Sequence, residues 1–479
     1  MPLVLGIDSA AGATTVEMRD ADDGRVYAAG RAPHRNPGAA DGEVDPSVWW
    51  HALVDARHAL GGALGVAAVA VAGQQPGLIV LDEAREVLRP AKLAAASDAV
   101  RQAEALVDDL GGPAEWVGEV GLVPDASSPI AQLAWLKRAE PEQWGRVASV
   151  LTPHDWLTYR LSRALVTDRG DASWTGYWSP RENRWRTDLL AYVDEEKDWS
   201  RCLPRVCGPR EPAGDRAGVL IAAGTGEPMA AALGLGLGPG DLAVALDRTV
   251  RVFTVRERPT DDPSGAVAGL ADAAGRFLPT VSLRNGMNAI GAVARLLGVD
   301  AHRFDQLALA APPGAGGVTV LPYFSAERPA ADLPSTGQIL GLRADVTAEE
   351  LARATVEGVV CSVLDGLDAL RAADVPLGGR ITLVGDGSRS HAVQHVLADL
   401  SQRAVSASAG DSAAATGACV QAAAALRGWP PHELAEAWRL APTREVEPDP
   451  TGDPEGVRGR FRAARDRARR GDDGRGAGS

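Results

Sequence analysis

Cysteine is scarce in this chain. Only four cysteines occur among 479 residues, at positions 202, 207, 361 and 419. Cys202 and Cys207 alone lie close in sequence, and their spacing fits neither a zinc site nor a redox pair. The scarcity excludes a disulfide-rich scaffold, and we expect reduced thiols in a cytoplasmic protein.

Long hydrophobic runs are also missing. No apolar stretch approaches the roughly 18 residues that would span a membrane. The segment Met1–Asp8 lacks the basic start of a signal peptide and is instead a predicted buried strand. No membrane partner is therefore expected.

Positive charge is in deficit. Lys and Arg number 49 against 63 Asp and Glu, which leaves a formal net charge of −14. This balance argues against nucleic acid as a partner. Hydrophobic and charged contents of 45% and 23% are ordinary for a globular protein. Because 479 residues exceed one ordinary core, two large domains are expected.

Hydrophobic periodicity and turn residues predict an α/β chain. Strands are predicted at 3–8, 15–20, 66–72, 79–81, 147–151 and, as a pair, 242–255. Helices are predicted at 49–60, 99–110, 129–139, 152–161, 287–297, 348–371 and 413–426. After about residue 442 the chain turns polar, with a short basic helix expected at 461–470 and a disordered end.

The stretch Ala223–Gly240 runs from a glycine turn into an Ala/Leu helix. Glu227 and Pro228 stand where the turn becomes the helix, and proline suits the first helical position. A carboxylate there is favoured by the helix dipole. Two interpretations follow: a well-made helix start, or a base held over a cleft.

Several motifs together resemble a known family. Gly337–Leu342 with Glu350–Glu357 is the most specific, and Pro153–Leu157 and Thr167–Ser173 agree with it. On these segments the chain resembles the FGGY carbohydrate kinases, most closely the actinobacterial xylulokinases, from residue 3 to about 430. The strand, tight turn and strand around Asp8 are similar to the first phosphate hairpin of actin-like ATPases.

The resemblance implies an α/β fold of two actin-like (ribonuclease H-like) ATPase domains with an interdomain cleft. Residues 1–240 would form the sugar-side domain and residues 241–442 the nucleotide-side domain, followed by a polar, partly disordered tail at 443–479. A sugar or polyol and a nucleotide would be the small-molecule partners, and a homodimer is left open.

The resemblance also implies ATP and Mg²⁺ as cofactors. Asp8 would be the metal-side carboxylate. The residues implied for the nucleotide come from three turns: Asp8, Gly12 and Thr14; Arg248 and Thr249; and Gly385, Gly387, Ser388 and Ser390. On the sugar side the implied residues are Gln74, Gln75, Asp98 and Pro228, with Glu227 as the catalytic base.

Several of these positions differ from the family pattern. Glu227–Pro228 replaces Asp–Asn, Ala10 and Ala11 replace Gly–Thr in the first phosphate hairpin, and Asp247 replaces a glycine in the second. Arg248 could bind phosphate or pair with Asp247, and the salt-bridged turn is favoured. The segment 94–98 loses nearly every polar group that would hold a sugar, and Gln132 replaces a lysine.

Three functions are consistent with this pattern. The first is an ATP-dependent kinase of the xylulokinase type, phosphorylating a ketopentose such as D-xylulose. The second is a non-catalytic pseudokinase that binds or regulates, and the third is a repurposed phosphotransferase with another substrate. Because the differences gather at functional positions, impaired kinase activity is predicted.

Overall fold

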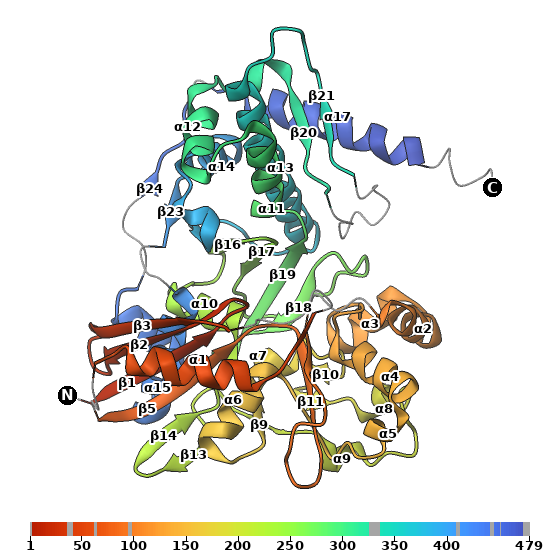
Figure 1. Ribbon diagram of the computed structural model, residues 1–479, viewed down its shortest axis with the longest axis vertical. Coiled ribbons are helices and arrows are strands. Elements are labelled where there is room, and N and C mark those ends of the chain that lie inside the picture. The colour runs from red at the N-terminus through yellow and green to blue at the C-terminus, as the bar shows by residue number, and fades with distance from the viewer. Residues whose placement is uncertain are drawn as a thin grey trace. The chain divides into compact units, whose positions relative to one another are not determined.

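The computed structural model describes residues 2–35, 42–61, 65–93, 98–324, 336–408, 412–440, 445–450 and 452–472. The chain divides into two compact units. The first comprises Met1–Leu237, Val255–Pro279 and Gly410–Ala441, and the second Gly238–Thr254, Thr280–Ala409 and Pro442–Ser479. Figure 1 colours the elements of both units by residue number.

The first unit is built on a mixed sheet in the order β13-β14-β5-β1-β2-β3, with β15 also pairing with β5. Its strands are β1 (Leu3–Ser9), β2 (Ala13–Asp20), β3 (Val26–Pro33), β5 (Val66–Gly73), β13 (Pro212–Arg216), β14 (Val219–Ala222) and β15 (Thr225–Gly226). β1, β2 and β3 are antiparallel neighbours, whereas β5 runs parallel to β1, β14 and β15.

Further strands and helices complete this unit. The remaining strands are β4 (Glu43–Val44), β6 (Gly77–Leu81), β7 (Ala91–Leu93), β8 (Ser149–Leu151), β9 (Val166–Asp168), β10 (Trp178–Ser179), β11 (Arg184–Trp185), β12 (Arg205–Cys207) and β18 (Ala268–Ala271). The helices are α1 (Ser47–His58), α2 (Val100–Leu110), α3 (Pro113–Val120), α4 (Pro129–Ala139), α5 (Pro141–Trp144), α6 (Pro153–Ser162), α7 (Arg169–Ala172), α8 (Thr187–Leu190), α9 (Trp199–Cys202), α10 (Glu227–Gly234), α15 (Ala413–Arg427) and α16 (Pro431–Ala437).

The alternation of side chains along β5 decides which helix covers which face of this sheet. Val69 and Val71 belong to the core cluster that contains α1 residues, while Ala68, Ala70 and Ala72 belong to the cluster that contains α15 residues. Because successive strand residues point to opposite faces, the large side chains meet α1 and the small ones meet α15. Figure 1 shows α15, drawn in blue, beside the red and orange strands.

Helix α15 approaches its neighbours at backbone distance. A Cβ added at Gly417 would overlap the backbone of Ala230 in α10, and one at Gly6 would overlap the backbone of α15. Only small residues allow such contact, which explains the alanine-rich sequence of α15. The helix therefore groups with the first unit although it follows residue 241 by more than a hundred and seventy positions.

The second unit repeats the same sheet pattern and contains, in the order β19-β17-β16-β22-β23-β24, six strands of a seven-stranded sheet. Its strands are β16 (Leu242–Leu246), β17 (Val250–Thr254), β19 (Phe277–Leu283), β20 (Thr319–Leu321), β21 (Gln338–Leu340), β22 (Ile381–Val384), β23 (Val405–Ala407) and β24 (Glu445–Val446). Its helices are α11 (Met287–Leu297), α12 (Ala301–Ala310), α13 (Ala348–Ala372), α14 (His391–Ser401) and α17 (Pro454–Asp472), with short 3₁₀ turns at Ala315–Gly317 and Asp386–Arg389.

The predicted α/β class with two domains is confirmed. The hairpins β1–β2 and β16–β17 lie in different sheets, each followed by a strand parallel to its first member. The four cysteines are free and buried, as expected. Within the described ranges, no helix has both the length and the apolar composition needed to cross a membrane.

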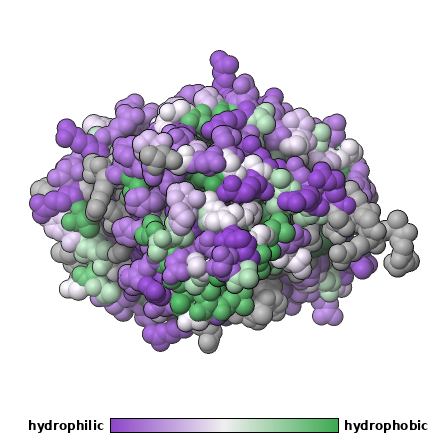
Figure 2. Space-filling view, turned by 90° about the horizontal axis from the view of Figure 1, so that it is seen from above, coloured by the Kyte–Doolittle hydropathy of each residue, from purple (hydrophilic) through white to green (hydrophobic). Residues whose placement is uncertain are grey.

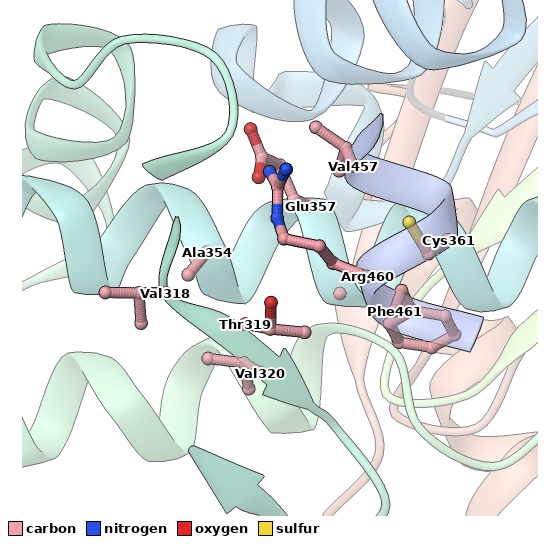
Figure 3. A pocket seen from close by; sticks show the side chains of 10 residues that line it. Val318, Thr319, Val320, Ala354, Glu357, Cys361, Val457, Arg460 and Phe461 are labelled. Atoms are coloured by element: carbon pink, nitrogen blue, oxygen red, sulfur yellow. The ribbon is translucent and has the colours of Figure 1, made fainter. Parts of the chain in front are cut away.

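The C-terminal segment differs from the expected tail. Residues 454–472 form α17, longer than the predicted helix at 461–470. Figure 3 shows how it docks: Val457 and Phe461 line one small gap together with β20 and Cys361 of α13. The gap left between them is only about 10 Å³, so the helix is packed into the unit. Arg458 and Arg462 pair with Asp368 of α13.

The face of the molecule in Figure 2 is mostly hydrophilic, with small hydrophobic areas between the polar ones. Singly exposed apolar side chains such as Leu296 and Leu342 are normal on a protein surface.

Removing the Phe461 ring tests the docking of α17. Phe461 is 2% exposed and lies beside the Tyr323 ring, so Phe461→Ala should destabilise the second unit by about 3–5 kcal/mol. Arg467→Ala, on the exposed side of the same helix, should stay within about 0.5 kcal/mol of wild type. Urea unfolding measures both, and equal stability of the two variants would contradict the docked helix.

Candidate functional site

The carboxyl ends of adjacent strands in the first unit bring several predicted site residues to one edge. Asp8 of β1 is in register with Ala72 of β5, and Ala72 is in register with Thr225 of β15. Gln74 and Gln75 directly follow β5, and Glu227 directly follows β15. In open α/β sheets this edge is where ligands bind.

The helix α10 begins where the sequence predicts, with Glu227 as its first residue and Pro228 as its second, one position later than expected for the proline. Glu227 is half-buried and Pro228 is buried. The positive end of the helix dipole favours an ionised carboxylate at this position. The geometry therefore suits a base, and the assignment of that role stays a prediction.

A buried histidine stands directly behind this edge. His154, at the second position of α6, is fully buried, and its Nδ1 lies 2.6 Å from Oδ2 of Asp171. Its Nε2 lies 2.9 Å from the carbonyl oxygen of Ala223. Since both ring nitrogens face acceptors, the ring donates from both only when it is an imidazolium.

The charges around His154 set its protonation. Burial alone would lower the pKa of His154, but the neighbouring carboxylates of Asp155 and Asp171, with the Asp171 hydrogen bond, raise it to about 10. Burial raises the pKa of Asp155 to about 7 and that of Asp168 to about 6. Near neutral pH the cluster therefore holds one cation against these carboxyl groups.

His154, Asp155 and Asp171 also offer ligand atoms close enough together for a metal ion. Each of these side chains already has a hydrogen bond within the protein. The ring of His154 is bonded to Asp171 and to the carbonyl of Ala223. The hydroxyl of Thr152 donates to Asp171, and the backbone N–H of Thr152 donates to Asp155 at 2.9 Å. A metal would have to displace these buried hydrogen bonds. The cluster fits an ion-pair network better than a metal centre.

Asp8 is the better fit for a cation such as Mg²⁺. Its carboxylate is 6% exposed, and Oδ2 accepts a hydrogen bond of 2.7 Å from Ser412, the N-cap of α15. Two nearby buried polar atoms, Ser9 Oγ and Gln74 Nε2, have no hydrogen-bond partner among the described residues. Mg²⁺ prefers oxygen ligands and keeps several waters, and this edge offers both oxygen and unmet hydrogen-bonding capacity.

The two predicted residues of the turn between β1 and β2 differ in their exposure. Gly12 is exposed, and a Cβ there would meet nothing within 4 Å. Thr14 is fully buried, and its hydroxyl is 3.0 Å from Nε2 of His34. Thr14 therefore offers its hydroxyl to His34 rather than to a ligand.

Several of the predicted sugar-side residues are already bonded to other side chains of the protein. Gln75 donates to Oδ1 of Asp171, the carboxylate that holds His154. Oδ2 of Asp98 forms an ion pair with Nζ of Lys92 at 2.7 Å, and the Lys92 side chain is only 1% exposed. Residues 94–97 of the same segment lie outside the described residues. Gln132 is buried, with its amide 3.5 Å from the carbonyl of Leu93.

In the second predicted turn, residues 247–249 of the second unit, one expectation is wrong. Asp247 does not pair with Arg248 in the part of the chain that the structure describes; Oδ1 of Asp247 accepts the backbone N–H of Asp386 at 2.8 Å. Arg248 and Thr249 are exposed. The salt-bridged turn was the favoured interpretation, and it is wrong because the glycine turn after β22 supplies a closer donor.

The glycine turn after β22 has the predicted form. Gly385 has φ +79°, which favours glycine, and a Cβ at Gly387 would collide with Leu246. The hydroxyl of Ser388 donates to the carbonyl of Gly385 at 2.7 Å. The hydroxyl of Ser390 donates to Asp305 and accepts the N–H of Val393 at 3.1 Å, so it caps α14. Both hydroxyls are used within the protein.

Sequence reasoning missed three residues of the first unit: His154, Asp171 and Lys92. The segments Pro153–Leu157 and Thr167–Ser173 were noticed only as family motifs. A signal was present, since a histidine and several aspartates in two otherwise buried segments require partners. Lys92 gave no signal; it is held by Glu43 and Asp98, with its Nζ 3.7 Å from the centroid of the Trp135 ring.

Comparison with known proteins agrees with this geometry. Residues 3–234 match the N-terminal domain, and residues 254–426 the C-terminal domain, of the FGGY family of carbohydrate kinases. A xylulose kinase of Streptomyces coelicolor is 40% identical over 451 residues, which cover 92% of this chain and 91% of that protein. A xylulose kinase of Streptomyces rubiginosus is 39% identical over the same shares.

A solved structure shares the whole fold. The crystal structure of xylulose kinase from Bifidobacterium adolescentis matches with a TM-score of 0.84 at 35% identity, covering 97% of this chain and 99% of that one. These findings confirm the resemblance drawn from the sequence motifs.

The pH dependence of stability tests the buried imidazolium. The pKa of His154 in the folded protein lies above its ordinary 6.5, so its stabilisation is complete below pH 6.5 and disappears as pH rises through about 10. Over that window the stability advantage of wild type over His154→Gln should fall by up to about 1.4 kcal/mol per pH unit. Urea unfolding at pH 7, 8 and 9 measures it, and a constant difference would contradict the charged ring.

Proposed function

The chain belongs to the FGGY family of carbohydrate kinases, and from that premise we propose that it is an ATP-dependent phosphotransferase of the xylulokinase type. Its substrate would be a ketopentose such as D-xylulose. The relatives that cover nine-tenths of the chain are xylulose kinases, which supports this substrate class. The observation that carries the proposal is the carboxylate of Glu227 at the start of α10, beside the strand ends with Asp8 and Gln74.

Phosphoryl transfer needs positioning and charge stabilisation more than covalent chemistry. Glu227 would accept the proton of the attacking sugar hydroxyl. Gln74, Gln75, Asp98 and Pro228 would face the sugar, and Asp8 would hold Mg²⁺ through its carboxylate. Bound Mg²⁺ neutralises charge on the phosphates of ATP.

The residues of the second unit would face the nucleotide. Arg248 and Thr249 are exposed and would face phosphate. Gly385 and Gly387, which lie against Asp247 and Leu246, would contribute their backbone to the adenosine site. Ser388 and Ser390 would act through the shape of that turn, because their hydroxyls are engaged with Gly385 and Asp305.

We further propose that turnover is slow. Glutamate is one methylene longer than the aspartate of the family pattern, and a displacement of about 1 Å can cost about 100-fold in rate. Asp247 adds a negative charge beside the glycine turn and occupies the N–H of Asp386, a donor that a phosphate could otherwise use.

The same observation favours a second candidate function. A carboxylate already bonded to Asp386 N–H repels polyphosphate and would weaken ATP binding to roughly millimolar or worse, since each lost charged hydrogen bond is worth about 1.5–3 kcal/mol. A protein that binds a sugar or polyol without phosphorylating it, and acts as a binding or regulatory protein, would tolerate this charge. A phosphotransferase with another substrate is the remaining alternative.

A coupled ADP-release assay on a panel of ketoses and polyols separates these functions. We expect slow turnover of D-xylulose that is lost in Glu227→Ala, because the carboxylate takes the hydroxyl proton. Glu433→Ala, an exposed glutamate of α16, serves as the matched control and should behave as wild type.

Each outcome of the assay assigns one function. Turnover of another substrate in preference to D-xylulose assigns the repurposed enzyme. No turnover with any substrate, together with saturable sugar binding, assigns the binding protein. Turnover that survives in Glu227→Ala removes Glu227 from the role of base.

Calorimetric titration with Mg-ATP tests the charge of Asp247. Asp247→Asn keeps an oxygen for Asp386 N–H but removes the negative charge, so affinity for Mg-ATP should rise about tenfold, or about 1.4 kcal/mol. Asp345→Asn removes the same charge from an exposed aspartate of the second unit and should leave affinity unchanged. Micromolar binding by wild type, or equal affinity of both variants, would contradict the repulsion.

A further inference from the structure

Three of the four residues before Glu227 are hydrogen-bonded to a buried partner. We call residues 223–226 the base turn. The carbonyl of Ala223 accepts from His154 at 2.9 Å, and the carbonyl of Gly224 accepts from Gln421 at 3.2 Å. The hydroxyl of Thr225 donates to Asp168 at 2.8 Å. Such a segment has little freedom to move without breaking buried hydrogen bonds.

Glycines let these partners come close. A Cβ at Gly224 would lie 2.8 Å from Cδ2 of His154, and a Cβ at Gly73 would lie 2.6 Å from Cβ of His154. A Cβ at Gly226 would overlap the side-chain amide of Gln75. The imidazole of His154 therefore lies against the base turn itself, not only within hydrogen-bonding range of it.

His154 reaches the base turn by two routes. The first is the direct hydrogen bond from Nε2 to Ala223. The second runs through Asp171, whose Oδ2 holds His154 and whose Oδ1 accepts from Gln75, the side chain that packs on Gly226. Both routes end within four residues of Glu227.

We propose that His154 is a positioning residue for Glu227, a buried cation that fixes the base turn through Ala223 and through the Asp171–Gln75 pair. This inference rests on the proposed role of Glu227 as base. His154 touches neither substrate nor cofactor in it, and acts only by holding the backbone that carries the carboxylate.

The charge of His154, rather than its bulk, is the operative property. Three carboxyl groups, Asp155, Asp168 and Asp171, are 1–4% exposed around it. A neutral replacement would leave Asp171 buried without its cationic partner, and an uncompensated buried charge strongly disfavours the arrangement that contains it. The base turn would then lose the His154 bond at Ala223 and the support of Gln75 at Gly226 together, while the longer bond of 3.4 Å from Thr158 to Ala223 remains.

Two substitutions of His154 separate charge from packing. His154→Leu removes the cation and both hydrogen bonds, whereas His154→Lys keeps a cation beside Asp171. Leu53→Ala, a buried residue of α1 in the same unit, is the control for general destabilisation. Thermal unfolding of all three variants first establishes that each is folded.

Hydrogen exchange followed by mass spectrometry measures how often the base turn opens. Peptides spanning residues 223–230 should exchange at least about tenfold faster in His154→Leu than in wild type, because local opening no longer breaks the buried bonds. His154→Lys should restore slow exchange, and Leu53→Ala should leave these peptides unchanged relative to the rest of the unit.

Enzyme kinetics test whether a loosened base turn impairs Glu227 as the base. In the ADP-release assay His154→Leu should lower kcat about 100-fold, because the base is displaced. His154→Lys should recover most of kcat. If wild type shows no turnover, the proposed function fails, while the exchange measurement still decides whether His154 holds the base turn.

Wild type alone provides a test that needs no variant to fold. With ¹⁵N-labelled histidine, NMR titration should find one of the eight histidines doubly protonated above pH 8. Eight histidines that all titrate near 6.5 would overturn the proposal, as would unchanged exchange in His154→Leu or equal loss of kcat in both His154 variants.

Discussion

A positive charge buried among carboxyl groups is the constraint on which the candidate site depends. His154 is fully buried, yet both of its ring nitrogens have acceptors, one from Asp171 and one from the backbone of Ala223. A buried cation is costly unless it is paired and hydrogen-bonded. The pairing joins α6, α7 and the segment before α10, three parts of the chain that are distant in sequence, into one arrangement behind the strand ends.

The packing of small residues determines where the rest of this unit can go. β5 presents valines to one face and alanines to the other, and glycines in β1, α10 and α15 remove the last obstacles to backbone contact. α15 can therefore lie directly on the sheet, with Ser412 at its N-cap bonded to Asp8. One helix thus both completes the core and reaches the carboxylate that would hold a metal ion.

The second unit shows how one side chain can redefine a turn. Burial raises the pKa of Asp247, while the N–H of Asp386 partly offsets that shift by stabilising the carboxylate. A backbone N–H in a glycine-containing turn commonly binds phosphate. Here the N–H of Asp386 is bonded to Asp247 within the protein, and the proposed weakening of nucleotide binding rests on that bond.

Local sequence was sufficient for about half of the helices and strands, for the helix start at Glu227 and, through contiguous motifs, for the family. Capping residues, proline positions and hydrophobic periodicity act over a few residues, so they can be seen without the fold. The partners of Asp247 and Gln75, the pair of Lys92 with Asp98, the docking of α17 and the cation at His154 could not be predicted this way. Each depends on groups brought together from distant segments, where burial and charge compensation, properties of the tertiary structure alone, decide which partner is chosen.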